Sequence, residues 1–194
     1  LGDVYKRQAE NDFLPDLDAI PEETARRAKF IYINYPNNPT GAVATKAFYE
    51  KLVAWAKTYE VGVVSDLAYG ALGYQGYENP SFLSTPGAKD VGIEFYTFSK
   101  TFNMAGWRLA FAAGNDQMIE ALNLIQDHLF VGIFPALQEA GIAALLDPKS
   151  EEAVAQLNAT YDSRRDAFVQ AAAKIGWQAF PSRGSCLLYT SDAA

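Results

Sequence analysis

The stretch YTFSKTFNMAGWRLAF, residues 96–111, begins and ends like a buried strand but carries polar and charged residues at its centre. Bulky apolar residues lead up to Ser99 and Lys100, and Arg108 opens a second apolar run, RLAFAAG, at residues 108–114. Ionised side chains are seldom buried in a core without a partner. We therefore expect strands over residues 92–99 and 108–114, and a functional reason for the cations between them.

Two further runs, AKFIYINYP at residues 28–36 and VGVVSD at residues 61–66, are also typical of buried strands. Between them lie the turn NNPTG and a predicted helix over residues 45–59, with Thr45 as its N-cap. We predict two more helices over residues 115–129, capped by Asn115, and 135–146. Continuously apolar strands with helices between some of them indicate an α/β fold, a three-layer α/β/α arrangement around a mostly parallel sheet.

A different pattern begins after residue 148. It predicts one long helix with Ser150 as N-cap, ending at Gly176, and then a strand at residues 177–180. Four apolar residues spaced by seven form a stripe that we expect to pack on neighbouring elements: Val154, Tyr161, Phe168 and Ile175. We therefore predict that residues 9–148 belong to a large domain, and that residues 149–185 are a connecting helix and the start of a smaller α+β domain.

The charge and composition of the chain exclude several classes of partner. Its 194 residues carry a net charge of −7, with no basic cluster larger than Arg164–Arg165, so we expect no nucleic-acid partner. No apolar run approaches the roughly 18 residues of a membrane-spanning helix, and the N-terminus has no signal-peptide pattern. We also find no group of residues with metal-ligand spacing. We expect a cytoplasmic protein that binds neither a membrane nor a metal.

The two ends of the chain are related through their codons. DVYKRQ, residues 3–8, can be encoded GAT GTG TAT AAG AGA CAG, and the reverse complement, read one base out of frame, gives CLLYTS, residues 186–191. Both resemble translated adaptor from a transposon-based sequencing library. We therefore expect residues 1–8 and 186–194, including the single cysteine Cys186, to be artefacts around an internal fragment, which the raw nucleotide reads would check.

Polar side chains follow each predicted strand at its carboxyl end, where open α/β sheets bind ligands. They are an amide, a carboxylate, a phenol, two hydroxyls, an amine and a guanidinium: Asn38, Asp66, Tyr69, Thr97, Ser99, Lys100 and Arg108. Each alone has an ordinary explanation as a turn residue, a capping carboxylate, a core aromatic residue or a solvated cation. Their placement together favours a shared ligand.

One cofactor, pyridoxal 5'-phosphate, requires this set of groups. The Lys100 amine would form a Schiff base with its aldehyde, and the Asp66 carboxylate would keep its ring nitrogen protonated. Asn38 and Tyr69 would bond the ring oxygen. The two hydroxyls and the fork of Arg108 would bind the phosphate. We expect Lys100, Asp66 and Tyr69 to be the catalytic residues.

Three stretches resemble the cofactor motifs of the class I and II aminotransferases, pyridoxal-phosphate enzymes of fold type I: YPNNPTG, SDLAYGAL and TFSKTFNMAGWRLAFAAGN. Their order and approximate spacing match, and the resemblance extends over nearly all of residues 9–185, nearest to the diaminopimelate and methionine-salvage aminotransferases. It implies the roles given above, with Lys100 also moving the substrate α-proton, a cis peptide between Asn38 and Pro39, and a homodimer. Thr97 stands where the family usually has serine or glycine. Threonine still offers a hydroxyl group that can bind the phosphate.

The resemblance implies transfer of an amino group between an amino acid and a 2-oxo acid. In this family the arginine that binds the substrate carboxylate lies outside the present segment, so we expect the segment alone to be inactive. Alternatives on the same scaffold are a pyridoxal-phosphate-dependent carbon–sulfur lyase and a cofactor-sensing regulatory domain. A nucleotide-binding α/β domain is disfavoured because the sequence contains neither G-x-G-x-x-G nor a P-loop.

Overall fold

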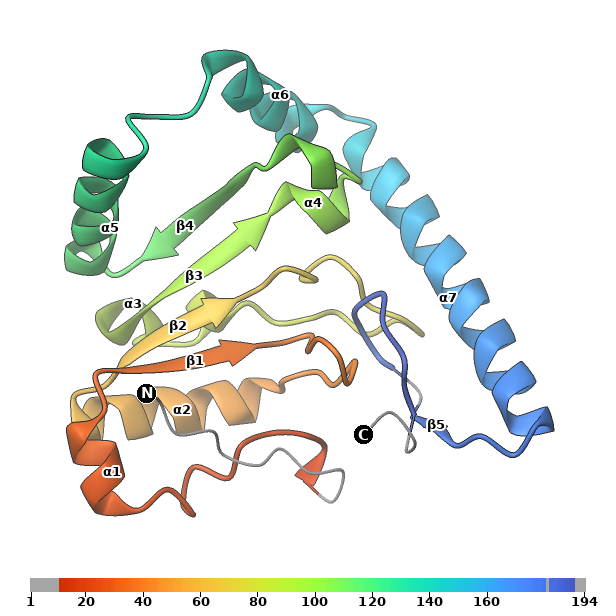
Figure 1. Ribbon diagram of the computed structural model, residues 1–194, viewed down its shortest axis with the longest axis horizontal. Coiled ribbons are helices and arrows are strands. Elements are labelled where there is room, and N and C mark those ends of the chain that lie inside the picture. The colour runs from red at the N-terminus through yellow and green to blue at the C-terminus, as the bar shows by residue number, and fades with distance from the viewer. Residues whose placement is uncertain (1–10, 181, 191–194) are drawn as a thin grey trace.

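The computed structural model describes residues 11–180 and 182–190. At its centre is a four-stranded sheet whose strands lie in chain order (Figure 1): β1 (Phe30–Asn34), β2 (Gly62–Asp66), β3 (Gly92–Thr97) and β4 (Ala110–Gly114). The first three strands are parallel, and β4 is antiparallel to β3. The mostly parallel sheet is therefore confirmed. The artefact predicted at residues 1–8 lies outside the described residues.

The strand register brings the carboxyl ends of the three parallel strands to one edge of the sheet. Asn34 lies opposite Asp66, Asp66 lies opposite Phe95, and Thr97 lies opposite Ala110. Because β4 runs the other way, its first residues reach the same edge. The polar residues predicted at strand ends therefore share this edge.

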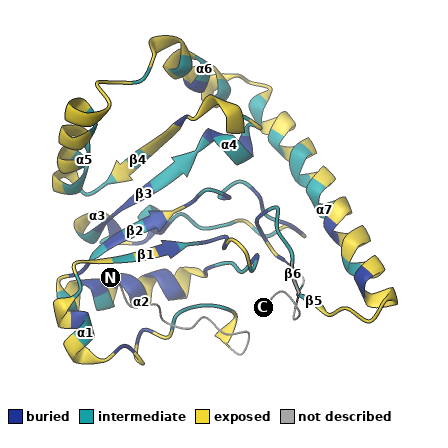
Figure 2. Cartoon of the chain, in the orientation of Figure 1, coloured by how far each residue is buried: buried dark blue, intermediate teal, exposed yellow. Residues whose placement is uncertain are grey.

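Helix α2 (Lys46–Tyr59) packs on one face of the sheet and supplies much of the core (Figure 2). Thr45 caps it as predicted, since its Oγ1 accepts the backbone N–H of Phe48 at 3.1 Å. Leu52 on the helix and Ile33 and Val63 on the sheet are almost wholly buried. Helix α1 (Glu22–Arg27) and the segment before it close the same cluster.

The opposite face of the sheet is partly open. Side chains alternate along a strand, so the neighbours of buried Ile33 point the other way. Of these neighbours, Tyr32 is 74% exposed. Phe30 lies two residues before Tyr32, points to the same face and is 50% exposed. The α/β class is confirmed, but among the described residues no helix covers β1 on this side, where we expected the third layer.

A buried carboxylate stabilises the connection between β2 and β3. Glu94 of β3 is 6% exposed and accepts hydrogen bonds from Ser65 Oγ at 3.0 Å, Ser81 Oγ at 2.5 Å and the Phe82 N–H at 2.8 Å. These donors replace the water that the carboxylate loses on burial. They fix the 3-10 helix η2 (Phe82–Ser84), which precedes α3 (Ala88–Val91).

A short helix, α4 (Phe98–Thr101), follows β3 directly, so the strand predicted over residues 92–99 ends at Thr97. The Thr97 Oγ1 accepts the backbone N–H of Ser99 at 3.2 Å and caps this helix. The 3-10 helix η3 (Ala105–Trp107) comes next, and the strand predicted from residue 108 begins at Ala110. Arg108 has a left-handed backbone, with φ of 55°, which no strand residue adopts.

Helices α5 (Asp116–Leu129) and α6 (Pro135–Leu146) match their predicted ranges. Asn115 caps α5 as predicted, with its Oδ1 accepting the Met118 N–H at 3.1 Å. No residue of α5 is buried, and Figure 2 shows the helix exposed along most of its length. Both helices therefore form as predicted while much of their apolar surface faces solvent.

The predicted N-cap of the long helix α7 (Ser150–Lys174) is wrong, and its predicted end is confirmed. The Ser150 hydroxyl donates to Ala144 O at 2.6 Å, and Lys149 is the N-cap. The Lys149 N–H is bound instead by Asp147 Oδ1 at 2.8 Å. At the other end Gly176 has φ of +79°, and its N–H donates to the carbonyl of residue 173 at 3.2 Å.

The face by which α7 contacts the rest of the chain matches the predicted apolar stripe only in part, since Val154 and Tyr161 are half-buried on it. Phe168 and Ile175 are 45% and 66% exposed, whereas Arg165 is 6% exposed. The Arg165 guanidinium pairs with Asp162 at 2.6 Å and lies 5.1 Å from the centre of the Tyr74 ring. An ion pair and an aromatic face satisfy this buried cation, and apolar spacing gives no sign of such a contact.

After α7 the chain returns to the loop that follows β2. Arg183 O accepts the Tyr74 N–H at 3.0 Å, and β5 (Ala179–Phe180) pairs with β6 (Tyr189–Thr190). Residues 186–190 of the predicted C-terminal artefact are thus described, and residues 191–194 lie outside the described residues. The artefact and the domain boundary at residue 148 stay predictions. Within the described ranges, no helix combines the length and apolar character needed to span a membrane.

Candidate active site

The seven predicted site residues belong to the strand ends and to the segments that follow or precede them at the sheet edge where the parallel strands end; Figure 1 shows this edge. Asn38 lies in the turn after β1, Asp66 is the last residue of β2, and Lys100 lies in α4 directly after β3. The Asn38–Pro39 peptide is cis, as predicted, and the Tyr35–Pro36 peptide is also cis.

Lys100, Tyr69 and Asn38 form the centre of this edge. The Lys100 Nζ lies 5.8 Å from the centre of the Tyr69 ring, and Tyr69 itself is 5% exposed. Burial raises the pKa of the Tyr69 phenol, the nearby Cys186 raises it further, and a hydrogen bond with the Asn38 side chain acts in the opposite direction. The phenol is therefore held protonated, beside an amine and an amide.

Asp66 also faces this centre. Its carboxylate is accessible from the open edge, and Oδ1 accepts the Ala68 N–H at 3.1 Å. Partial burial raises the pKa of Asp66, and the Ala68 N–H lowers it. Asp66 contributes to the raised pKa of Tyr69, so the two groups interact electrostatically. A cation placed at Asp66 would stabilise the ionised carboxylate that burial disfavours.

The two hydroxyls are in contact with each other, whereas the guanidinium bonds to a backbone carbonyl of its own loop. The Thr97 Oγ1 lies 2.9 Å from the Ser99 Oγ and 3.3 Å from Leu109 O. Arg108 is next in the chain to Leu109, is exposed, and donates from Nη1 to Ala105 O at 2.9 Å. Arg108 thus shares the edge with the hydroxyl pair, while its side chain bonds its own loop.

The chemistry of this set fits pyridoxal phosphate. The edge combines one amine, one carboxylate and a phenol–amide pair at its centre with two adjoining hydroxyls and a guanidinium on the α4 side. A phosphate is bound best by hydroxyl, N–H and guanidinium donors, and a protonated ring nitrogen by a carboxylate. Each group of the cofactor therefore has a matching residue.

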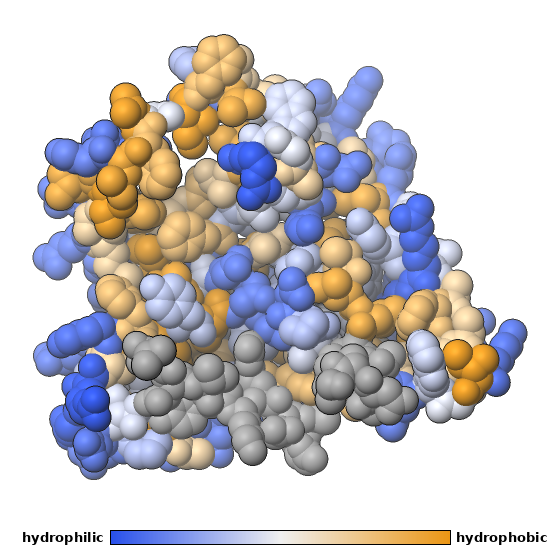
Figure 3. Space-filling model, in the orientation of Figure 1, coloured by the Kyte–Doolittle hydropathy of each residue, from blue (hydrophilic) through white to orange (hydrophobic). Residues whose placement is uncertain are grey.

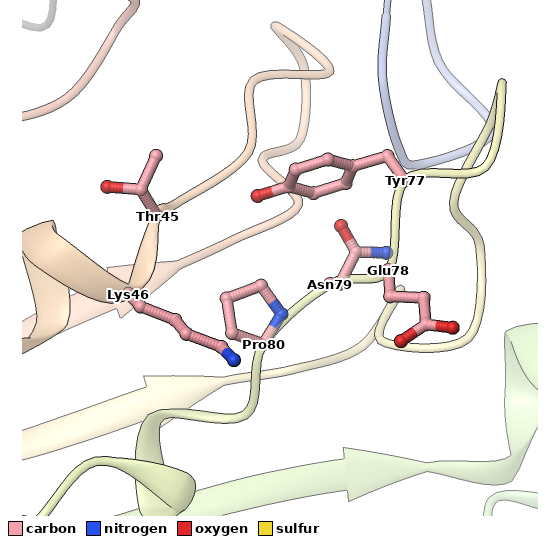
Figure 4. A pocket seen from close by; sticks show the side chains of 6 residues that line it. All are labelled: Thr45, Lys46, Tyr77, Glu78, Asn79 and Pro80. Atoms are coloured by element: carbon pink, nitrogen blue, oxygen red, sulfur yellow. The ribbon is translucent and has the colours of Figure 1, made fainter.

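A hollow of about 300 Å³ lies elsewhere, between the start of α2 and the segment that precedes η2 (Figure 4). Six residues line it, and all but the proline carry a polar group: Thr45, Lys46, Tyr77, Glu78, Asn79 and Pro80. The Tyr77 hydroxyl donates to Ala44 O at 2.8 Å, which joins the two sides. None of the seven predicted site residues lines this hollow.

Three asparagines that the sequence did not single out stabilise the turn and loops at this edge. Asn37 is 2% exposed, and its Oδ1 accepts the Thr40 hydroxyl at 2.8 Å within the turn. The Asn79 Nδ2 donates to Gly70 O at 3.1 Å and Leu72 O at 3.0 Å, fixing the loop that carries Tyr69. The third, Asn34, ends β1 two residues before the predicted end of this strand at Pro36. A polar residue closing an apolar strand was the available signal.

Comparison with known proteins gives a family match over nearly the whole chain. The model of the family described as "Aminotransferase class I and II" matches residues 3–193. The chain is 54% identical over 173 residues to the L-glutamine--4-(methylsulfanyl)-2-oxobutanoate aminotransferase of Bacillus subtilis. It is 51% identical over 169 residues to the LL-diaminopimelate aminotransferase of Moorella thermoacetica. These matches cover 89% and 87% of this chain but 43% of each relative, so the chain spans less than half their length.

Solved structures give the same result. The substrate-bound BacF structure from Bacillus subtilis superposes with a TM-score of 0.89 at 45% identity, covering 93% of this chain and 45% of that chain. A double mutant of the Thermus thermophilus aspartate aminotransferase superposes with a TM-score of 0.86 at 28% identity, covering 93% and 47%. The predicted resemblance to fold type I aminotransferases, including the diaminopimelate and methionine-salvage enzymes, is confirmed.

Proposed function

The chain belongs to the class I and II aminotransferase family, and from this premise we propose that its parent protein transfers an amino group between an amino acid and a 2-oxo acid. Members of this family depend on pyridoxal phosphate. The observation that carries the proposal is the convergence of Lys100, Tyr69 and Asp66 at one sheet edge. Bound there, the cofactor would supply an electron sink for the substrate α-carbon.

We propose a separate role for each group at the edge. Lys100 Nζ would hold the cofactor, and the same amine would move the substrate α-proton. Asp66 keeps the positive charge on the ring nitrogen. Asn38 and Tyr69 orient the ring through its oxygen, which suits a phenol kept protonated by burial. The remaining three residues hold the phosphate: Thr97, Ser99 and Arg108.

The assembly and the substrates of the parent protein are also part of the proposal. We propose that the parent is a homodimer, and that its amino donor is an α-amino acid and its acceptor a 2-oxo acid. The relatives named above act on diaminopimelate or on glutamine and a sulfur-containing 2-oxo acid, according to their names. The similarity of the chain to both relatives supports an amino donor of the kind that one of them uses.

Substitution of the lysine tests the proposal in the full-length parent. Lys100→Ala is expected to abolish amino transfer and to prevent the covalent retention of pyridoxal phosphate after borohydride reduction, as read by the mass of the chain. Lys46→Ala is the matched control because Lys46 is an exposed lysine at the start of α2. It should retain both properties. Amino transfer by Lys100→Ala above a trace would refute the assignment.

The same assay separates transamination from the lyase alternative. The wild-type parent is supplied with an amino acid in the presence and absence of a 2-oxo acid. Transamination requires the acceptor and produces a new amino acid. Release of ammonia and pyruvate without an acceptor would instead indicate a carbon–sulfur lyase.

A further inference from the structure

Asn34, the last residue of β1, bonds two of the segments that carry proposed cofactor residues. Its Nδ2 donates to Asp66 O at 3.0 Å, and its Oδ1 accepts the Asn38 N–H at 2.9 Å. A third bond joins its own carbonyl to the Asn37 Nδ2 at 3.2 Å. One amide thus connects the end of β1, the end of β2 and the turn between them.

Both side-chain bonds act on main-chain atoms of the residues that they position. The bond to Asp66 O fixes the point where β2 ends and its carboxylate projects. The bond to the Asn38 N–H fixes the turn that brings the Asn38 side chain to Tyr69. Asn34 lies opposite Asp66 in the sheet, so its side chain leaves the same face as the Asp66 carboxylate.

We propose that Asn34 is a positioning residue for pyridoxal phosphate, which acts by holding Asn38 and Asp66 in register with each other. This inference rests on the proposed function. Asn34 contributes both a donor and an acceptor, so neither an aliphatic residue nor a carboxylate can replace it. An aspartate would retain the acceptor for the Asn38 N–H and lose the donor to Asp66 O.

Asn115 offers a matched control at the opposite edge of the same sheet. Its Oδ1 accepts the Met118 N–H at 3.1 Å, and its Nδ2 donates to Asp90 O at 3.1 Å. It therefore makes the same two kinds of bond, between a strand end and its neighbouring segment. Asn115 lies at the carboxyl end of β4, which points away from the cofactor edge.

The experiment compares Asn34→Ala, Asn34→Asp and Asn115→Ala in the full-length parent. Cofactor-free protein is titrated with pyridoxal phosphate, and the pH dependence of the bound cofactor's absorbance is recorded. We expect both Asn34 variants to raise the Kd about tenfold and to shift the absorbance midpoint by about half a pH unit or more. Asn115→Ala should alter thermal stability and keep the Kd within about twofold.

Two outcomes separate the inference from the function on which it rests. If the wild type binds no pyridoxal phosphate, the proposed function fails. If the wild type binds it and either folded Asn34 variant keeps the absorbance midpoint of Asn115→Ala, the function stands and the positioning role is refuted, whatever the change in Kd. The absorbance midpoint is decisive, because a loss of stability alone would leave it unchanged.

Discussion

At the scale of single residues, the ionised Asp66 carboxylate lowers the folding stability of the cofactor-free protein. A bound cofactor with a positive ring nitrogen would remove this effect. Partial burial raises the pKa of its carboxyl, and the hydrogen bond from the Ala68 N–H lowers it. A carboxylate whose ionised form is disfavoured by burial lowers the folding stability at every pH at which it is ionised. The residue is therefore better suited to a bound cation than to the free protein, as expected of a functional carboxylate.

The pH dependence of stability tests this property. A raised folded pKa means that the folded state binds protons more readily, so stability falls as pH rises from the unfolded pKa through the folded pKa. In cofactor-free parent protein, Asp66→Asn should therefore equal or exceed the wild type in stability at neutral pH and lose that advantage near pH 3. Urea unfolding at both pH values measures it. If the free energy of unfolding of the wild type rose relative to that of the variant as pH rises, the direction of the Asp66 pKa shift would be contradicted.

The predictable part of the site consists of residues whose types carry chemistry. Asn38, Asp66 and Lys100 could be selected because amides, carboxylates and amines stood where apolar strands ended. The roles of Asn34 and Asn79 could not be predicted from the sequence. Each side chain acts through hydrogen bonds to backbone carbonyls that approach it only in the folded chain. The orientation of Arg108 toward Ala105 O follows from a left-handed backbone that its apolar neighbours do not indicate.

At the scale of elements, helices were predictable where a cap and a regular apolar spacing coincide. Helix α2 shows both, with Thr45 before it and Leu52 and Ala56 buried along it. Helix α4 has only four residues, too few to show any period, and its first two residues fell within the strand predicted over residues 92–99. The buried face of α7 was predicted only in part, because it also contains Arg165, a charged residue that a pattern of apolar residues leaves out.

The cap of α2 can be tested against a threonine on the same helix. Thr45→Ala removes the acceptor for the Phe48 N–H and should cost about 1 kcal/mol of folding free energy. Thr58→Ala is the control, since the Thr58 hydroxyl donates to Ala54 O on an exposed turn and caps nothing. It should be neutral or slightly stabilising, because alanine is the better helix former. Equal losses in urea unfolding of the parent protein would contradict the capping role.

The attachment of α7 can be tested through adjacent arginines. Arg165 is buried and pairs with Asp162 and with Asp166, the latter at 2.5 Å, whereas Arg164 is exposed. Arg165→Met in the parent protein should cost about 2 kcal/mol, less than a wholly buried pair would, because both aspartates keep contact with water. Arg164→Met should change stability by less than about 0.5 kcal/mol. Similar thermal midpoints for the two variants would contradict the assigned contact.

At the scale of the whole molecule, apolar side chains gather over α5 and α6 in Figure 3. The exposed members of this α5–α6 patch come from both helices and the loop between them: Leu124, Ile125, Leu129, Phe130, Val131, Phe134, Ile142, Leu145 and Leu146. A surface of this kind marks an interface in a folded protein and promotes aggregation when uncovered. The relatives are more than twice as long as the matched segment, which leaves ample chain to cover it.

The 194-residue chain alone is therefore expected to self-associate through the α5–α6 patch. Light scattering during size exclusion should show species larger than a monomer, and the dye ANS should bind strongly. Leu129→Ser combined with Phe134→Ser removes two residues that are 69% and 70% exposed, and should reduce both signals. Ile175→Ser, at a 66% exposed position directly after α7, is the control and should change neither. A monomeric chain that binds no ANS would show that the patch is covered within this segment, because apolar area hidden from water neither binds the dye nor drives association.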